Sequence, residues 1–417
     1  MKSNTPSFSR PLRCFALALA TAVSTTAAEM PLTIETATRH AVAHNADLAA
    51  AQWTVAEARG RLTQAGRWSN PELEGEFAPH VRGRESTLTV GFSQRFPLTA
   101  RLRLERTVAR THVQIAEAEV RNVTRQLCLQ VRETAVRSIA LATEITLREQ
   151  QIANAQALAS TLRRAAEAGE GSPIDADHLD LELARLESRR LQSLAAQAET
   201  HGHLLLLLGL PPETTLVWTE TLADPATLTM PESAGDVRPD LAAARARAVA
   251  ANQAVDLARA HRWEDVRVGL FGEVNRAEDA PVGVETDTLL GMRLALPLPL
   301  WNRGRGRLEE AAATAARAEQ ETTALQQRVE AEARAARRQG NTSLRLAESI
   351  SQNLLPKARR LEERLMEHHR AGQTPFAEVL RARERRLELE TALAETHRDF
   401  HLARVRLLAA QGVLETP

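Results

Sequence analysis

The chain has 417 residues, contains no tyrosine, and draws only 3% of its residues from the aromatic types. Ala, Leu, Arg and Glu are abundant, a composition typical of long packed helices. Lys plus Arg and Asp plus Glu number 53 each, so the formal net charge is +0. This balance excludes the basic excess expected of a nucleic-acid-binding protein, and the scattered charges indicate solvated helix faces.

The first 28 residues have the pattern of a secretory signal peptide. Basic residues come first, an apolar run over residues 14–23 follows, and small residues continue through Ala28. We therefore expect export and cleavage near Ala27 or Ala28. Cys14 lies at the start of the apolar run rather than at its end, so no lipid anchor is expected. Cys128 is then left without a disulfide partner and indicates a small core or interface residue.

Beyond the leader, the sequence consists of two similar halves about 200 residues apart. The segment Asp-Leu-Ala-Ala-Ala at 47–51 returns at 240–244, and the stretch 168–209 is echoed at 371–412. Each copy predicts a helix, a β-hairpin and a long helical hairpin. We therefore expect a first repeat over 29–230 and a second over 231–417.

The element bounds expected within each repeat follow from the same comparison. In the first repeat the β-hairpin lies at about 72–97 and the helical hairpin at 101–209. In the second repeat the β-hairpin lies at about 265–297 and the helical hairpin at 302–412.

The predicted strands alternate between apolar and polar residues. Over residues 87–96, Leu88, Val90 and Phe92 share one face, and Leu290, Met292 and Leu294 do so in the second repeat. About ten such residues match a tilted transmembrane strand, whose apolar side meets lipid and whose charged side meets a wet lumen. A half-buried hairpin in a soluble protein is the alternative. Four strands cannot close a barrel in lipid, whereas three copies would supply twelve.

The predicted helices are too long for a compact domain. No Pro or Gly occurs between Arg101 and Gly169, so a helix here extends on the order of 100 Å. Its copy, from about Arg307 to Arg370, contains Gly340 and Pro356, where we expect an interruption and a kink. A fibrous coiled coil is the alternative reading of such helices, but it would not require the β-hairpins.

Three segments carry a resemblance to a known family. They are Pro-Leu-Pro-Leu-Trp-Asn-Arg-Gly-Arg-Gly at 297–306 and the two predicted hairpin turns at 168–175 and 371–380. On these segments the chain resembles the TolC family of outer membrane efflux proteins over its mature length. The sequence of residues 297–302 is most similar to the heavy-metal branch of the family, the cobalt-zinc-cadmium (CzcC-like) channels.

This resemblance implies a mainly α-helical fold with a membrane β-barrel portion. It implies a homotrimer in which a twelve-stranded β-barrel spans the outer membrane and an α-helical barrel extends into the periplasm. Such a trimer is the passive exit channel of a tripartite efflux pump. Its implied partners are a periplasmic adaptor (membrane fusion protein) and an inner-membrane transporter of the resistance-nodulation-division type.

The implied cargo is divalent heavy-metal cations. Two alternatives stay open: the same architecture serving drugs or secreted polypeptides, and a non-porous periplasmic coiled-coil scaffold. A duct performs no chemistry, so no enzyme activity and no cofactor are expected.

Both helical turns contain residues typical of a sharp reversal. Glycine supplies the positive φ that such a turn needs, and Gly169 and Gly372 stand at the two reversals. Ser172 and Thr374 resemble helix-start signals. The prolines after them suit a first helical turn: Pro173 and Pro375. Turn and cap chemistry accounts for this pattern without any further function.

The resemblance adds a role for these tips as the surface that meets the adaptor. It covers Gly169, Ser172, Asp175, Gly372, Thr374 and Glu378. An acidic position equivalent to Glu378 narrows the closed aperture in the family. Where the family has a second acid one turn later, this chain has Arg381. The aperture therefore contains either a Glu378–Arg381 ion pair or no acidic ring.

No catalytic or metal-binding pattern stands out. The histidines at 201 and 203, and at 368 and 369, do not share a helix face as an i, i+4 pair would. Gly304-Arg305-Gly306 lacks the remaining features of a phosphate-binding loop. We therefore expect no catalytic, cofactor or metal site.

Overall fold

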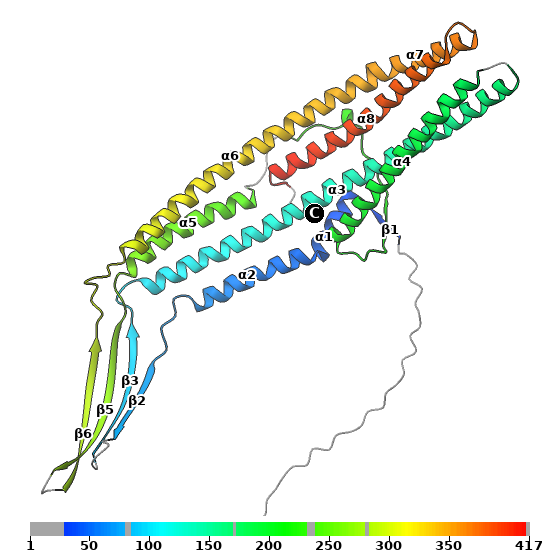
Figure 1. Ribbon diagram of the computed structural model, residues 1–417. Coiled ribbons are helices and arrows are strands. Elements are labelled where there is room, and N and C mark those ends of the chain that lie inside the picture. Colours follow the sequence, from blue (N-terminus) through cyan, green and yellow to red (C-terminus); the bar gives the residue numbers. More distant parts are fainter. Residues whose placement is uncertain (1–28, 80–84, 170–171, 232–237, 280–282, 414–417) are drawn as a thin grey trace, which may run out of the picture.

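The computed structural model describes residues 29–79, 85–169, 172–231, 238–279 and 283–413. The expected signal peptide over 1–28 lies outside the described residues. The molecule is elongated: long helices run side by side along its length, a group of strands extends from one end, and two helical hairpins form tips at the other (Figure 1).

The helices form one layer, in which the two long helices α3 and α6 each pack against several neighbours. Helix α3 packs against α2, α4, α5 and α8, and α6 packs against α5 and α8. Helices α2 and α5 lie toward the strands, whereas α4, α7 and α8 reach the tips (Figure 1). The bounds are α2 Ala46–Gln64, α3 Arg101–Glu167, α4 Pro173–Leu208, α5 Pro239–Ala260, α6 Arg305–Ser349, α7 Leu355–Arg370 and α8 Phe376–Ala410.

Helix α3 runs without interruption for 67 residues, which confirms the long helix expected from the absence of Pro and Gly. Its counterpart in the second half is divided into α6 and α7 by a π-helical turn, η2 (Ile350–Leu354), shortly before Pro356. A proline lacks the N–H of the helical ladder and crowds the preceding carbonyl, and the wider π turn relieves both effects. Among the described residues, none of the helices combines the length and the apolar content that crossing a membrane requires.

The interruption expected at Gly340 is wrong, because α6 continues through this residue. Gly340 is buried, and a Cβ at this position would collide with the side chain of Met230. The glycine therefore serves close packing of a connecting segment against α6 rather than a break in the helix.

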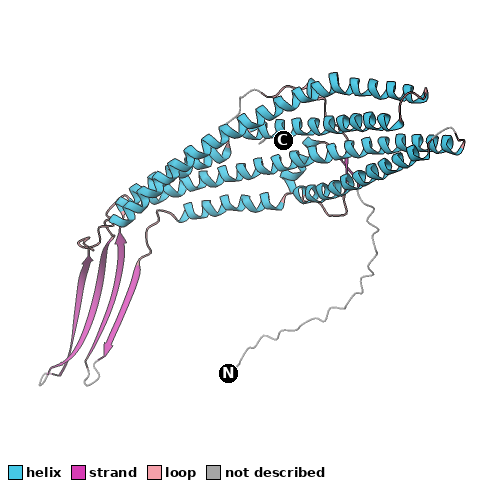
Figure 2. Cartoon of the chain, turned by 45° about the horizontal axis from the view of Figure 1, so that its top comes forward, coloured by secondary structure: helices cyan, strands magenta, loops and turns pink. Residues whose placement is uncertain are grey.

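Four strands form one antiparallel sheet in the order β2-β3-β5-β6 (Figure 2). Their bounds are β2 Glu72–Pro79, β3 Ser86–Phe96, β5 Val266–Asp279 and β6 Gly283–Ala295. The central pairing joins the two halves of the chain, with Ser86 opposite Arg276 and Phe96 opposite Val266. The two hairpins therefore form one surface, whose two faces follow from a single register.

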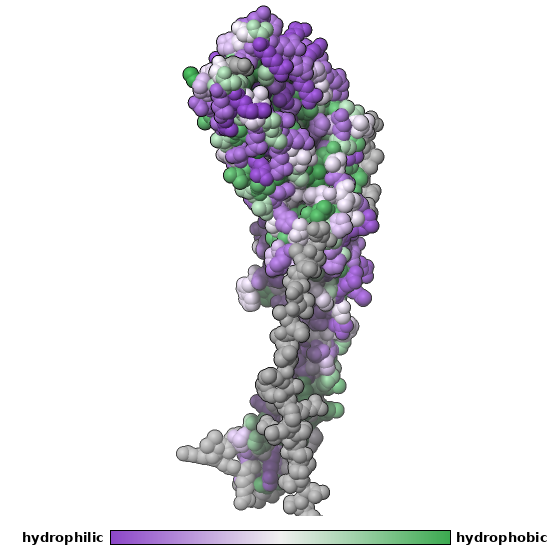
Figure 3. Space-filling model, turned by 90° about the vertical axis from the view of Figure 1, so that its right-hand side faces the viewer, coloured by the Kyte–Doolittle hydropathy of each residue, from purple (hydrophilic) through white to green (hydrophobic). Residues whose placement is uncertain are grey.

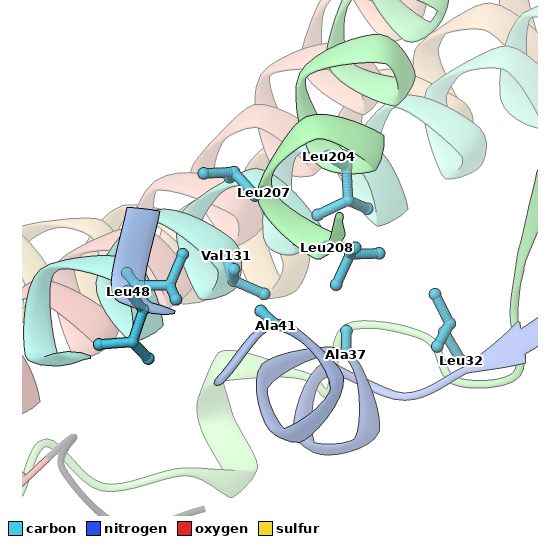
Figure 4. Close-up of a cluster of buried hydrophobic side chains, with 9 residues drawn as sticks. Leu32, Ala37, Ala41, Leu48, Val131, Leu204, Leu207 and Leu208 are labelled. Atoms are coloured by element: carbon cyan, nitrogen blue, oxygen red, sulfur yellow. The ribbon is translucent and has the colours of Figure 1, made fainter. Parts of the chain in front are cut away.

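A small second sheet lies near the middle of the molecule and was not expected from the sequence. Strand β1 (Glu29–Leu32) pairs in parallel with β4 (Thr215–Trp218), next to helix α1 (Ile34–His44). Four residues per strand are too few for a periodicity signal. The side chains of this region form the core shown in Figure 4, which draws on α1, α2, α3 and α4: Leu32, Ala37, Ala41, Leu48, Leu127, Val131, Leu204, Leu207 and Leu208.

Asn45 lies where α1 ends and α2 begins, and its side chain links α2 to α4 beside this core. Its side-chain oxygen accepts a hydrogen bond from Leu48 N at 3.0 Å, which caps α2. Its amide donates to Leu207 O at 3.1 Å, near the end of α4. Gly209, at φ 67°, lies so close to the His44 carbonyl that a side chain would clash. These contacts fix where the first helical hairpin closes onto α1 and α2.

Replacing Asn45 by Ala is expected to lower the free energy of unfolding by about 2 kcal/mol, since a cap and a buried hydrogen bond are both lost. Asn45→Ser is the matched control, because its hydroxyl can still cap α2 while the donor to Leu207 is lost. Denaturant unfolding measures both variants. Equal stability of Asn45→Ala and the wild-type chain would show that the junction does not depend on this side chain.

Residues 223–227, which follow β4, pack against α8. His401 Nε2 lies 2.8 Å from Ala223 O, beside the short 3-10 helix η1 (Pro225–Thr227). Burial lowers the pKa of His401 below its ordinary 6.5, and the charge of Arg404 acts in the same direction. Burial also lowers the pKa of His397, against the opposing effect of Asp224.

Both histidines therefore bind fewer protons in the folded than in the unfolded chain below pH 6.5. Stability is expected to fall as pH decreases below that value, by at most about 1.4 kcal/mol per pH unit for each group. Thermal unfolding between neutral and mildly acid pH tests this. The double variant His397→Gln/His401→Gln should lose less stability on acidification than the wild-type chain, and an unchanged pH slope would contradict the assignment.

Candidate functional site

The two faces of the four-stranded sheet differ in chemistry. One face carries large apolar side chains that are between 50% and 83% exposed in the single chain: Leu73, Phe77, Val90, Phe92, Leu270, Leu290, Met292 and Leu294. Contiguous apolar surface of this kind is rare on a monomer in water and indicates contact with lipid or protein. This is the apolar face that the alternating pattern predicted.

The opposite face carries an ion-pair network at the end nearest the helices. Arg95 pairs with Glu72 at 2.8 Å, and Arg267 lies 3.6 Å from both Glu72 and Glu74. Arg293 lies 3.8 Å from Glu74 and completes the row. Partly exposed ion pairs of this kind are stable in contact with water and not with lipid. This face is therefore the one suited to an aqueous lumen.

Phe271 is a feature of the charged face that the sequence pattern did not reveal. Register places it between Gly91 and Gly291, and a Cβ on Gly291 would collide with its ring. The Arg293 guanidinium lies 5.1 Å from the ring centroid, in cation–π geometry. The two glycines make room for a ring lying across the sheet, a relation visible only once the strands are paired.

Both outer strands present an open edge. Within the described residues, β2 pairs only with β3, and β6 pairs only with β5. A free edge leaves backbone N–H and C=O groups without partners, which lipid does not tolerate. The sheet therefore needs further strands from outside this chain if its apolar face lies in a membrane.

At the other end of the molecule, the two tips reverse through glycine. Gly169 has φ 76° and Gly372 has φ 71°, which confirms the positive φ expected at both turns. An added Cβ would meet nothing within 4 Å at either residue. Backbone conformation, and not space, therefore requires glycine at the two tips.

The helix starts at the tips differ from the expected caps. Ser172 is the N-cap of α4 and is followed by Pro173 in the first turn, but its side chain forms no capping hydrogen bond. In the second tip the expectation is wrong, because α8 begins at Phe376 with Pro375 as the N-cap. Thr374 precedes the cap, and its carbonyl lies 3.0 Å from His369 Nδ1. The ring of His369 also packs against the buried Phe376, which holds the turn.

A hollow of about 920 Å³ lies between the two tips. Five of the six predicted tip residues line it: Gly169, Ser172, Asp175, Gly372 and Thr374. Figure 3 shows mainly hydrophilic surface over this end of the molecule, interrupted by separate apolar patches. Residues about 200 positions apart in the sequence thus meet in one concave surface.

The sixth predicted residue, Glu378, lies outside this hollow and forms an ion pair with Arg381 at 2.7 Å. Of the two arrangements left open by the sequence, the single chain has the paired one. Both side chains are exposed, so the pair contributes at most about 1 kcal/mol. Its charges are therefore available to a neighbouring copy or to ions.

Two of the histidines considered earlier have structural partners. His201 Nε2 lies 3.0 Å from Thr214 O, and His369 contacts Thr374 as described. In the described part of the chain, no group of three or more His, Cys, Asp or Glu side chains is placed to hold a metal ion.

Comparison with known proteins agrees with this architecture. The model of the family "Outer membrane efflux protein" matches residues 38–210. Residues 38–210 are therefore similar to this family, and the fold of the chain is TolC-like. A curated relative, the pyoverdine export outer membrane protein OpmQ of Pseudomonas putida, is 29% identical over 307 residues, which are 66% of this chain. The chain spans 62% of the length of that relative.

Solved structures extend the similarity over both halves. CusC, whose crystal structures concern its folding and transmembrane channel formation, aligns with a TM-score of 0.76 and 18% identity. The alignment covers 91% of this chain and 92% of CusC. VceC, an outer membrane protein of Vibrio cholerae, aligns with a TM-score of 0.73 and 18% identity, over 91% and 96%. The outer-membrane channel OprN also reaches 0.73 at 18% identity, over 92% and 91%.

These comparisons confirm the TolC-like fold. The heavy-metal branch is a finer assignment that these relatives leave untested.

Gly372→Pro is expected to abolish efflux while leaving the assembly intact, because proline fixes φ near −65° where the turn needs a positive value. Gly169→Pro should act in the same way. Export from cells and the oligomeric state after detergent extraction are the two measurements. Gly202→Ala, within α4, is the matched control and should be neutral, since its surroundings are open. Loss of the oligomer in the proline variants would assign the glycines to folding rather than to docking.

Proposed function

We propose that three copies of the chain form the outer-membrane exit duct of a tripartite efflux pump. The observation that carries this proposal is the sheet with one exposed apolar face, one ion-paired face and two open edges. In a ring of copies, β6 of one pairs with β2 of the next. Three sheets of four strands give a closed barrel of twelve, with lipid outside and water inside.

The helices support the same ring. Four residues of α6 are buried in the single chain, all of them Ala or Gly, so most of its surface is available to a neighbour. On the opposite side of the layer, Trp53 of α2 is 75% exposed. We propose that the edge formed by α2 and α4 packs against the edge formed by α6 and α7 of the next copy, which extends the barrel as a helical tube into the periplasm.

The two tandem repeats, 29–230 and 231–417, are proposed to arise from one duplicated half. Each contributes a β-hairpin to the barrel and a helical hairpin to the tube. The tips then face the inner membrane, and the hollow between them is the proposed docking surface for a periplasmic adaptor. A transporter of the resistance-nodulation-division type would supply the energy, since the duct itself holds no energy source.

For the cargo, we propose divalent heavy-metal cations. The similarity of residues 297–302 to the heavy-metal branch supports this class. Acidic residues further along the charged face of the sheet also favour cations: their register positions are Glu76, Glu273 and Asp287. In a trimer these carboxylates would surround the lumen beyond the ion-pair network.

Export of an organic compound is a second candidate, because the Pseudomonas putida relative is described as a pyoverdine export protein. Cells lacking the chain distinguish the two. Sensitivity to zinc, cobalt or cadmium that the wild-type gene corrects would support cation export. Unchanged metal tolerance together with retention of an organic chelator inside the cell would support the second candidate and contradict the first.

Conductance of the extracted protein in a planar bilayer tests the duct itself. Arg381→Ala leaves Glu378 without its partner and is expected to raise the preference for cations, whereas Glu378→Ala should lower it. The reversal potential under a salt gradient reports this preference. Arg334→Ala breaks a similar exposed pair on α6, with Glu330 at 2.9 Å, and should change nothing. Absence of discrete conductance in the wild-type protein would favour the coiled-coil scaffold.

A further inference from the structure

Two histidines of helix α1 lie one helical turn apart and share a face of the helix. His40 and His44 are four residues apart, the spacing at which side chains on a helix are neighbours. Their rings are stacked, with centroids 4.2 Å apart and planes inclined by 20°. His44 is exposed and His40 is half-buried, so solvent reaches the pair. The histidines at 201 and 203, and at 368 and 369, do not have this spacing.

Hydrogen bonding directs one ring nitrogen of His44 toward the backbone. His44 Nδ1 lies 3.0 Å from the His40 carbonyl oxygen. A carbonyl only accepts, so this bond places the proton on Nδ1 and leaves a lone pair on Nε2. In His40, Nδ1 is buried, and the Leu208 backbone lies beside the ring. Metal-binding histidines have this arrangement, in which one nitrogen faces a backbone carbonyl and the other binds the ion.

We propose that His40 and His44 bind one divalent transition-metal ion through their Nε2 atoms. Bonds from an imidazole nitrogen to such an ion are about 2.0 to 2.1 Å long, so two of them can join rings stacked at this distance. In the described part of the chain, no third His, Cys, Asp or Glu side chain completes a metal-binding group. Water therefore fills the remaining positions of the ion.

The donor set selects the metal. Two neutral imidazoles with water favour copper(II), because this ion prefers tetragonal nitrogen and oxygen coordination and has the highest affinity in the series of divalent ions. Nickel and zinc also bind imidazole, but more weakly. A structural zinc site uses four protein ligands, which this pair does not supply.

A second pair of histidines has the same spacing but a different environment. His397 and His401 lie four residues apart on α8. His401 is 9% exposed, its Nε2 is engaged with Ala223 O at 2.8 Å, and its ring packs edge-on against Phe400. Spacing alone therefore does not make a metal site, and this buried pair is an internal control for the exposed one.

The proposed site lies at the junction that positions the first helical hairpin. His44 is the last residue of α1, and a Cβ on Gly209 would meet its carbonyl oxygen at 2.7 Å. An ion that joins His40 to His44 requires the last turn of α1 to stay helical, so binding stabilises this turn where Gly209 packs against it. The site uses neither the sheet nor the tips, and the proposal therefore does not depend on the duct.

Copper(II) titration of the full-length, detergent-extracted protein, prepared without a polyhistidine tag, tests the site. Calorimetry should give one tight site per chain, and the electron paramagnetic resonance spectrum should show coupling to two nitrogen atoms. His44→Ala should lower the affinity at least about tenfold, since even the outer partners of metal ligands are worth about 10- to 100-fold. The spectrum of this variant should show coupling to one nitrogen.

His397→Gln, in the buried pair, is the matched control and should keep the wild-type affinity and both nitrogen couplings. His203→Ala, at an exposed position of α4, should do the same. The melting temperature without metal should be equal in His44→Ala and the wild-type chain, because the ring of His44 is exposed. Amide exchange in the last turn of α1 should slow with copper in the wild-type chain and not in His44→Ala.

Three results would overturn the proposal. Wild-type affinity in His44→Ala would place the ion elsewhere. Zinc binding as tight as copper binding, with the same dependence on His44, would contradict a site of two imidazoles. Lack of copper binding by the assembled wild-type protein would show that the rings are not available there. Bilayer conductance without metal keeps this proposal separate from the duct, because its absence would refute the duct and leave the copper titration unaffected.

Discussion

The backbone hydrogen bond between strands is the interaction on which the rest of this structure depends. A strand edge with unpaired N–H and C=O groups is stable in water but not in hydrocarbon. Within the described residues, the sheet has an exposed apolar face and two free edges, so it needs partner strands if it lies in a membrane. In the proposed ring these strands come from neighbouring copies, and the shape of the helical layer must be compatible with ring closure.

The register of the sheet and the junction at Asn45 fix how the parts of the chain lie relative to one another. Pairing of β3 with β5 fixes how the two halves lie side by side, since a slip of one residue would exchange the apolar and charged faces. At the middle, Asn45 and Gly209 fix where α1, α2 and α4 meet. Nearer the tips, buried residues of α3, α4 and α8, among them Ala159, Leu179 and Leu387, pack together and hold the two hairpins next to each other.

Much of this architecture is predictable from sequence because it rests on periodicity and on turn residues. Alternation over 87–96 identified the apolar face, the absence of Pro and Gly identified α3, and Gly169 and Gly372 identified the reversals. The predicted cap at Thr374 failed because backbone geometry at Pro375 decides where α8 begins. Phe271 and the strands β1 and β4 depend on partners distant in sequence.

The π-helical turn at 350–354 has a consequence for the second tip. A π turn takes more residues than an α turn, so the side chains that follow it are rotated around the axis relative to an uninterrupted helix. One extra residue corresponds to about 100°. The residues of α7 that face α8 therefore do not continue the residue spacing of those in α6 that face α8. Helix α3 has no such interruption along its length. The two hairpins of one chain are therefore built differently: α3 is one continuous helix, whereas α6 and α7 are joined by a turn of different winding.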